Sequence, residues 1–199
     1  MRVIGLTGGI ASGKSTVGKQ LADLPEIAVL DADLVAHEVM APTGPAYAEV
    51  VAYFGQGILN AEGHIDRPKL GALVFNNPEA LKALNERVHP HVRTAMQNWV
   101  ADQRASGRIQ TAFLMIPLLY ESNLTHLSEE VWVVYCTPEQ QLERLMHRNG
   151  LNETEAKARL AAQWPIDKKR ELADWVIENT GNAKDLNAQI AQTIQRRLS

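Results

Sequence analysis

The amino-terminal segment alternates apolar runs with a stretch of helical spacing. Val3 to Leu6 is a continuous apolar run that is typical of a buried strand. From Lys14 to Leu24, Val17 and Leu21 stand four residues apart, as they do on one face of a helix. A second apolar run, Ile27 to Leu30, predicts another buried strand. The pattern therefore predicts strand, loop, helix and strand, in that order.

The pattern from Leu34 to Val100 is mostly helical, with Asn77 before Pro78 as a cap followed by proline at the first helical position. The expected helices are Tyr47 to Phe54, Pro68 to Phe75, Pro78 to Val88 and His91 to Ala105. The sequence His89-Pro90-His91 is interpreted as a helix junction and not as a metal dyad, because no further ligands cluster nearby. This block is longer than one crossover between strands needs, so we interpret part of it as an insertion that binds a substrate.

The carboxyl-terminal half returns to strands. Thr111 to Ile116 and Val131 to Cys136 are apolar runs suited to buried parallel strands, with Trp132 in the core. A helix over Glu139 to His147 follows a capping box, and a second helix begins after Asn152. The stretch "ADWVIEN", which contains Trp175, predicts a last strand, and Lys184 to Leu198 a closing amphipathic helix.

These elements predict an α/β fold, a parallel sheet flanked by helices, with a helical substrate-binding insertion and a helical lid. We expect a single domain with its core at 1–33, 106–140 and 172–199, the insertion at about 34–105 and the lid at about 141–171.

Composition narrows the class of protein. The chain has 199 residues, 45% of them hydrophobic, and a net charge of −3, which argues against a surface devoted to nucleic acid or membrane. Its one cysteine, Cys136, excludes an intramolecular disulfide and a cysteine-based zinc site, and is interpreted as inert packing. No apolar run is long enough for a signal peptide or a membrane span. We expect a cytoplasmic protein, monomeric or a small homo-oligomer, without nucleic-acid or membrane partners.

The loop after the first predicted strand matches a phosphate-binding pattern. In "MRVIGLTGGIASGKST", Gly8, Gly13, Lys14 and Ser15 fill every fixed position of G-x-x-x-x-G-K-[ST]. Glycines are needed where backbone N–H groups approach phosphate oxygens closely, and the following helix adds its positive end. Lys14 supplies a cation for the β- and γ-phosphates, and the Ser15 hydroxyl is a ligand for Mg²⁺. The motif predicts nucleotide binding but not what is done with the nucleotide.

Two carboxylates follow the second predicted strand. Asp31 and Asp33 stand at the end of that strand, where ligands of open α/β sheets bind. They could orient water bound to Mg²⁺ or accept a proton from a hydroxyl nucleophile. Alternatively, Asp33 caps a helix that begins at Leu34. The spacing leaves both interpretations open.

Cations gather in the last third of the chain. Arg144 and Arg148 share a helix face at i, i+4, and guanidinium groups match phosphate oxygens bidentately. Helices that carry such arginines over a nucleotide would clamp phosphates and exclude water. The alternative is a solvated helix face paired with Glu143 and Glu155.

The ordered series of motifs resembles the dephospho-coenzyme A kinases, a branch of the phosphate-loop nucleoside-kinase-like fold. The stretches that carry the resemblance are "LTGGIASGKST", "DAD", "AHEV", "RPKLGALVF", "LNERVHPHV", "IPLLYE", "QLERLMHRNGL", "ARLAAQ" and "ADWVIEN". The resemblance implies transfer of phosphate from ATP, with Mg²⁺, to the ribose 3′-hydroxyl of dephospho-coenzyme A, the last step of coenzyme A synthesis.

The resemblance also assigns roles to residues. It implies Lys14, Asp33 and Arg144 as catalytic groups, with Asp33 as the base. The implied ATP-binding residues are Gly8, Gly9, Ala11, Ser12, Gly13, Lys14, Ser15, Thr16, Arg144 and Arg148. The implied acceptor-binding residues are Asp33, His37, Arg67, His89, Pro117, Leu118 and Leu119.

Two other functions share part of this pattern. A kinase for another small hydroxyl acceptor would use the same loop, metal and lid. A GTPase-type switch would need an Asn-Lys-x-Asp stretch after a strand, and the sequence has Asn182, Lys184 and Asp185 in a different spacing at a helix start.

Overall fold

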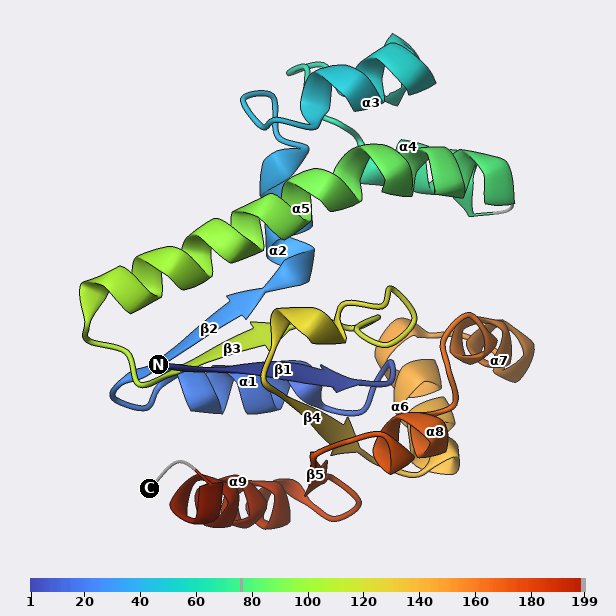
Figure 1. Ribbon diagram of the computed structural model, residues 1–199. Coiled ribbons are helices and arrows are strands. Elements are labelled where there is room, and N and C mark those ends of the chain that lie inside the picture. The colour runs from blue at the N-terminus through green and yellow to red at the C-terminus, as the bar shows by residue number, and fades with distance from the viewer. Residues whose placement is uncertain (76, 198–199) are drawn as a thin grey trace. The chain divides into compact units, whose positions relative to one another are not determined.

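A five-stranded sheet forms the centre of the fold in the computed structural model, which describes residues 1–75 and 77–197 (Figure 1). The strands lie in the order β2-β3-β1-β4-β5. Their bounds are β1 (Arg2–Gly8), β2 (Ile27–Asp31), β3 (Thr111–Met115), β4 (Glu130–Tyr135) and β5 (Trp175–Glu178). The registered pairs β1–β3, β1–β4 and β4–β5 run parallel. The predicted α/β class is confirmed, and β1, which leads into the phosphate loop, is the central strand.

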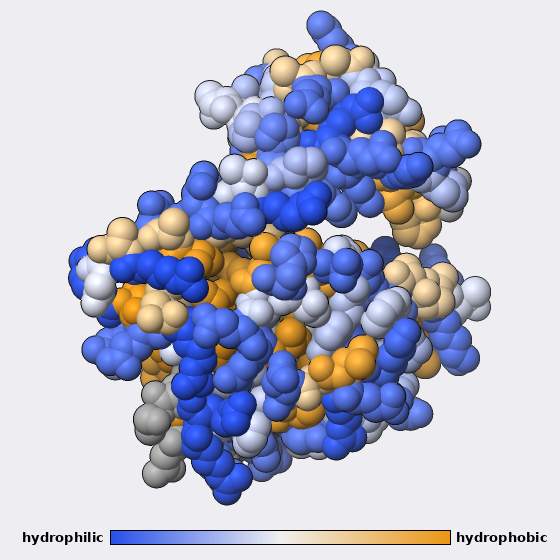
Figure 2. All heavy atoms as spheres, viewed as in Figure 1, coloured by the Kyte–Doolittle hydropathy of each residue, from blue (hydrophilic) through white to orange (hydrophobic). Residues whose placement is uncertain are grey.

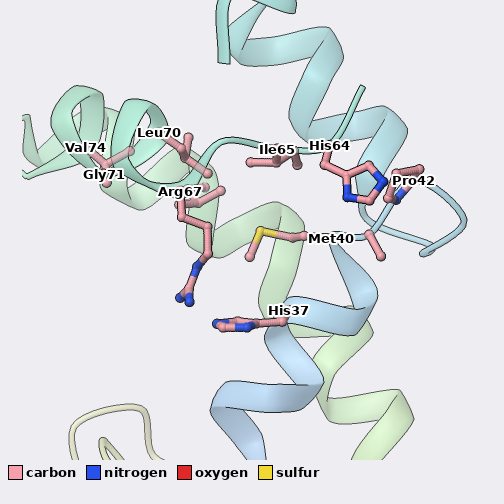
Figure 3. Close-up of a pocket in the computed structure, with 11 residues that line it drawn as sticks. His37, Met40, Pro42, His64, Ile65, Arg67, Leu70, Gly71 and Val74 are labelled. Carbon is pink, nitrogen blue, oxygen red and sulfur yellow. The ribbon is translucent and has the colours of Figure 1, made fainter. Parts of the chain in front are cut away.

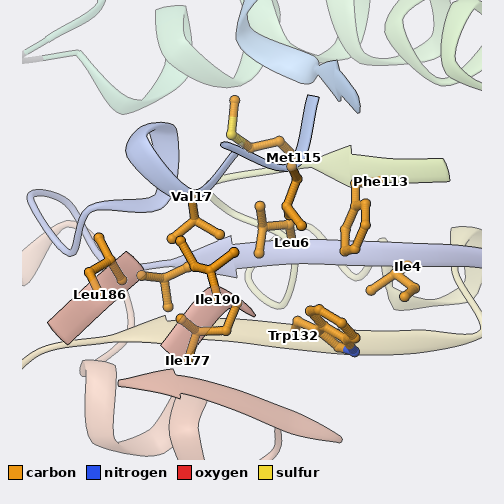
Figure 4. Close-up of a cluster of buried hydrophobic side chains, with 11 residues drawn as sticks. Ile4, Leu6, Val17, Phe113, Met115, Trp132, Ile177, Leu186 and Ile190 are labelled. Atoms are coloured by element: carbon orange, nitrogen blue, oxygen red, sulfur yellow. The ribbon is translucent and has the colours of Figure 1, made fainter. Parts of the chain in front are cut away.

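The chain divides into two compact units, residues 1–30 with 102–199, and residues 31–101. The core of the first unit lies between the sheet and its helices, with α1 (Lys14–Ala22) packed on β1 and β3 and α9 (Ala183–Arg197) on β5 (Figure 4). Phe113 and Trp132 are both fully buried, and their rings meet edge to face at 5.2 Å. Trp175 packs against the same cluster, so both tryptophans have the predicted core role. Leu198, the predicted end of the closing helix, lies outside the described residues.

Helix caps in this unit follow the sequence signals closely. The first helix after β4, α6 (Pro138–Asn149), begins with a complete capping box between Thr137 and Gln140 and ends at Gly150 in the left-handed conformation. The next, α7 (Glu153–Ala161), begins with a second complete box, made by Asn152 and Glu155. A further helix, α8 (Ile166–Glu171), packs on β4 and was not predicted.

The second unit is helical. It contains α2 (Ala32–Val39), α3 (Tyr47–Phe54), the 3-10 turn η1 (Gln56–Ile58), α4 (Arg67–Val74) and most of α5 (Pro78–Ser106). The predicted junction at Pro90 is wrong, because α5 continues through the proline as one helix of 29 residues. Proline removes one helical hydrogen bond, at roughly 3 kcal/mol. An apolar face that continues on both sides, with Val88 and Val92 buried, offsets this loss.

The surface shown in Figure 2 is predominantly hydrophilic, which agrees with the net charge and composition of the chain. Over the described residues, none of the helices is both long enough and apolar enough to span a bilayer.

Candidate nucleotide site and acceptor pocket

The phosphate loop connects the end of β1 at Gly8 to the start of α1 at Lys14. Two of its residues adopt the left-handed conformation, Ala11 with φ 61° and Gly13 with φ 97°. Such alternation turns successive N–H groups toward a common concavity that suits an anion. Gly13 also begins the helix, since its carbonyl accepts the N–H groups of Thr16 at 3.0 Å and Val17 at 3.1 Å. The loop therefore has the backbone conformation that its motif predicts.

Close packing explains the first glycine of the motif. A side chain at Gly8 would place its Cβ 2.7 Å from the Val134 carbonyl and 2.5 Å from Ser12 Oγ, so position 8 admits no side chain without a shift of the strand. Ser12 is fully buried, and within the described part of the chain its hydroxyl has no hydrogen-bond partner. A buried hydroxyl without a partner is costly. A polar ligand on the loop would relieve that cost.

Three carboxamide side chains from the carboxyl-terminal half hold the loop in place. Gln163 Oε1 accepts the Ile10 N–H at 2.8 Å, and Gln141 Nε2 donates to the Ile10 carbonyl at 2.7 Å. Asn179 Nδ2 donates to the Ser12 carbonyl at 2.8 Å in a fully buried hydrogen bond. The conformation of the loop thus depends on residues more than 120 positions away.

Asn179→Leu is expected to lower the free energy of unfolding by about 1–3 kcal/mol, because it leaves the buried Ser12 carbonyl without its donor. Urea unfolding followed by circular dichroism measures this change. Asn187→Leu is the control, since the Asn187 side chain accepts only an exposed hydrogen bond, from Gln20. Equal, small losses for both variants would contradict the role assigned to Asn179.

The two predicted lid arginines differ in their surroundings. Arg144, half-buried on α6, donates to the Asn179 carbonyl at 3.0 Å, which connects it to the residue that holds the loop. Arg148 is exposed, and its Nε donates to Asn149 Oδ1 at 2.9 Å. Neither contact involves Glu143 or Glu155, the partners of the alternative interpretation. A role of Arg144 and Arg148 in phosphate binding stays a prediction.

Cys136 lies at the end of β4 beside the loop, with Sγ 4.0 Å from the Ala11 carbonyl. Burial raises the pKa of its thiol, and the nearby Arg144 charge opposes that effect only in part. The thiol is therefore neutral at pH 7 and packs against the loop, as predicted.

The segment Pro117–Leu118–Leu119 follows β3 in the first unit. The Pro117 carbonyl accepts a hydrogen bond from Thr7 Oγ1 on β1 at 3.1 Å, and Leu119 is fully buried. Leu118, in contrast, is exposed. Of the three residues, Leu118 presents an apolar side chain at the surface, and the acceptor contact of this segment stays a prediction.

In the second unit, the carboxylates near the end of β2 have separate roles. Asp31 caps α2, and its Oδ1 accepts the Asp33 N–H at 2.9 Å. The interpretation of Asp33 as the cap of a helix beginning at Leu34 is wrong, because the helix begins two residues earlier, at Ala32. Asp33 is exposed in the first turn of the helix, so capping does not account for its carboxylate.

A pocket of about 310 Å³ lies within the second unit (Figure 3). Its lining residues come from α2, α4, α5 and the connections between them: His37, Met40, Ala41, Pro42, His64, Ile65, Arg67, Leu70, Gly71, Val74 and Leu84. Figure 3 shows the His37 ring and the Arg67 guanidinium toward the same end, with Met40 and Ile65 farther along. The pocket therefore combines apolar side chains with the Arg67 guanidinium and the His37 ring at one end, and with the His64 ring away from that end.

Only part of the predicted acceptor set meets in this pocket. His37 and Arg67 line it, whereas Asp33 and His89 are absent from its described lining. His89 lies on α5 with part of its side chain covered and part exposed. Desolvation, followed by the Arg93 charge, lowers the pKa of His89, which favours the neutral imidazole at pH 7.

The sequence did not predict the roles of Gln141, Gln163 and Asn179 at the phosphate loop. Asn179 directly follows β5, and the carboxyl ends of parallel strands meet at one edge of a sheet, so its position carried a usable signal. Gln163 lies between two helices, where no periodicity or motif marks it.

The central strand, the glycine loop and the helix that follows define the class of protein, a phosphate-loop nucleotide-binding protein. A model of the dephospho-CoA kinase family matches residues 2–185. The chain belongs to this family.

Individual relatives cover nearly the whole chain. A dephospho-CoA kinase of Carboxydothermus hydrogenoformans is 46% identical over 194 residues, 98% of this chain and 93% of the relative. One of Geobacillus kaustophilus is 49% identical, over 97% of this chain and 95% of the relative. The solved structure of dephospho-CoA kinase from Campylobacter jejuni superposes with a TM-score of 0.68 at 31% identity, covering 98% of this chain and 96% of that one.

Proposed function

We propose that this protein transfers the γ-phosphoryl group of ATP to the ribose 3′-hydroxyl of dephospho-coenzyme A, giving coenzyme A and ADP, the final step of coenzyme A biosynthesis. The observation that carries the proposal is an intact phosphate loop in a chain that matches the family over residues 2–185. We further propose that the segment at about 34–105 binds the acceptor and that the segment at about 141–171 forms a lid. We also propose that the enzyme acts in the cytoplasm.

The donors present suit Mg²⁺. Ser15 offers a hard hydroxyl oxygen at the start of α1. Over the described residues there is no group of three or more His, Cys, Asp or Glu that could hold a metal ion by itself. Mg²⁺ is commonly bound by one or two protein oxygens together with substrate phosphates, which fits Ser15. When bound, the ion neutralises charge on the phosphates of ATP.

The chain's own residues supply positioning, charge and proton transfer. The N–H groups of the phosphate loop hold the phosphates, and Lys14 and Arg144 stabilise the charge of the moving phosphoryl group. Asp33 accepts the proton of the acceptor hydroxyl. Exclusion of water by the lid favours transfer to the acceptor over hydrolysis.

The pocket of the second unit suits an acceptor with both apolar and anionic parts. Met40, Ile65 and Leu70 offer apolar contact, while Arg67 offers a guanidinium for phosphate oxygens. Dephospho-coenzyme A combines a long, weakly polar arm with a diphosphate, so both kinds of contact have a counterpart.

Arg67→Met is expected to raise KM for dephospho-coenzyme A about tenfold, because it removes one charge-assisted contact to the acceptor. KM for ATP should change less than twofold. Steady-state kinetics with each substrate varied in turn measures both values. Lys82→Met serves as the control, since Lys82 is exposed on α5 and pairs with Glu86 at 3.7 Å. An unchanged KM for the acceptor would remove Arg67 from the acceptor site.

ADP production from ATP and Mg²⁺ tests the function directly. We expect sustained release of ADP with dephospho-coenzyme A, and coenzyme A as the second product. Parallel reactions contain nucleoside monophosphates or shikimate. Turnover with one of these alone would retain the kinase reaction and overturn the acceptor, and tight retention of GTP without turnover would favour a switch.

A further inference from the structure

A lysine with no exposed surface lies beside the phosphate-loop region. Lys169, on α8, is fully buried. Its Nζ lies 2.8 Å from Glu121 Oε1 and donates to the Pro117 carbonyl at 3.1 Å. Burying an ion pair gives little net stability, since well-packed apolar side chains often serve as well. The placement of this pair therefore calls for an explanation other than stability.

One route of contacts runs from the ion pair to the phosphate loop through Gln163. Glu121 Oε1, which binds Lys169, also accepts the backbone N–H of Trp164 at 2.9 Å. The neighbouring residue, Gln163, accepts the Ile10 N–H of the loop. By fixing the backbone at Trp164, Glu121 fixes the position from which Gln163 reaches the loop.

A second route of contacts runs from the ion pair to β1, the strand that leads into the loop. The Pro117 carbonyl, which accepts from Lys169, also accepts from Thr7 Oγ1 at 3.1 Å, and Thr7 directly precedes Gly8. The Tyr120 and Trp164 rings also stack, 6.3 Å apart and nearly parallel, which helps to hold Trp164 and the neighbouring Gln163 in place. The two routes reach the chain at Thr7 and at Ile10, on either side of Gly8 at the beginning of the loop.

We propose that Lys169 and Glu121 are positioning residues that set the affinity of the phosphate loop for ATP. They act through Gln163 and through the Pro117 carbonyl, without contact to the nucleotide. The inference rests on the proposed function, because it takes ATP as the ligand of the loop. It predicts that the pair influences nucleotide binding more than folding.

The main test is the double variant Lys169→Met with Glu121→Gln. Methionine keeps most of the length of lysine, and glutamine keeps the shape of glutamate and an oxygen for the Trp164 N–H, so no uncompensated charge remains buried. Titration calorimetry on the whole protein measures the Kd for ATP with Mg²⁺, and a thermal scan measures Tm. We expect the Kd to rise about tenfold, while Tm stays within a few degrees of the wild-type value.

A mutant cycle tests the route through Gln163. Gln163→Leu alone should also raise the Kd for ATP, and adding it to the double variant should raise the Kd by less than the product of the separate effects. Independent, multiplicative effects would contradict the route. Should the double variant fail to unfold cooperatively, Lys169→Gln with Glu121→Gln serves, because it also leaves no buried charge and keeps a donor for the Pro117 carbonyl, with an expected rise of at least about threefold.

The matched control is Lys82→Met with Glu86→Gln, the same two substitutions in an exposed pair at i, i+4 on α5, outside the proposed lid and outside the lining of the pocket. It should leave both the Kd and Tm unchanged. A Kd within twofold of wild type in the Lys169 and Glu121 variant would overturn the inference, whatever happened to Tm. The proposed function fails separately, if the wild-type protein neither binds ATP nor releases ADP with dephospho-coenzyme A.

Discussion

Lys14→Met is expected to lower kcat/KM for phosphoryl transfer by about 10³-fold, the largest loss from any single substitution considered. Lys14 is the first residue of α1, directly after Gly13, where the helix N-terminus already favours anions. Its ammonium adds a full positive charge to the partial charges of the loop N–H groups. Charge that develops on the transferring phosphoryl group is best stabilised by a cation already in place, so the loss should fall mainly on kcat.

Lys19→Met is the matched control, because Lys19 lies in the last turn of the same helix with its side chain exposed. Coupled-assay kinetics give kcat and KM for both variants, and thermal unfolding verifies that each is folded. We expect Lys19→Met to retain wild-type kinetics. A loss of less than tenfold in Lys14→Met would mean that the loop N–H groups carry the phosphates without the lysine.

The phosphate loop and the helix caps could be predicted because their information is local. Gly8, Gly13, Lys14 and Ser15 follow one another at fixed spacing, and the boxes at Thr137 and Asn152 each involve a residue only three positions ahead. A local pattern determines local geometry with little dependence on the remainder of the chain. The strands could be predicted equally well, since buried parallel strands are continuous apolar runs in the sequence.

Predictions failed where packing outweighed a local preference. Pro90 signals a helix end, yet α5 continues through it because buried residues on both sides belong to one apolar face. At α2, the sequence left open whether Asp33 caps a helix beginning at Leu34, because aspartate is a favourable N-cap residue. The structure selects Asp31, which moves the start of the helix to Ala32.

The contacts of Gln163 and Lys169 could not be predicted for a different reason. Gln163 contacts the loop at Ile10 across more than 150 positions. The partners of Lys169, Pro117 and Glu121, lie far earlier in the chain. Lysine side chains are mostly exposed in folded proteins, and no motif in the sequence marks Lys169 as buried. Only the packed structure shows that its ammonium is buried.

Asp33→Asn is the second large effect expected, a fall in kcat of about 10²-fold with the Kd for ATP unchanged. The substitution keeps the size of the side chain and the backbone N–H that Asp31 accepts, so α2 should still begin at Ala32. It removes only the capacity to accept a proton from the acceptor hydroxyl. A base that acts in the transition state lowers kcat when removed, whereas a residue that only binds substrate raises KM.

Glu38→Gln is the control, the same change of carboxylate to amide at an exposed position of the same helix. Kinetics at saturating ATP, calorimetry for the Kd of ATP, and thermal unfolding separate the possibilities. A fall in kcat for Asp33→Asn alone supports the base, because helix stability and nucleotide affinity are then shown to be intact. Since Asp31 already provides the cap, unchanged turnover in Asp33→Asn could not be attributed to a capping role and would require the proton to leave by another group.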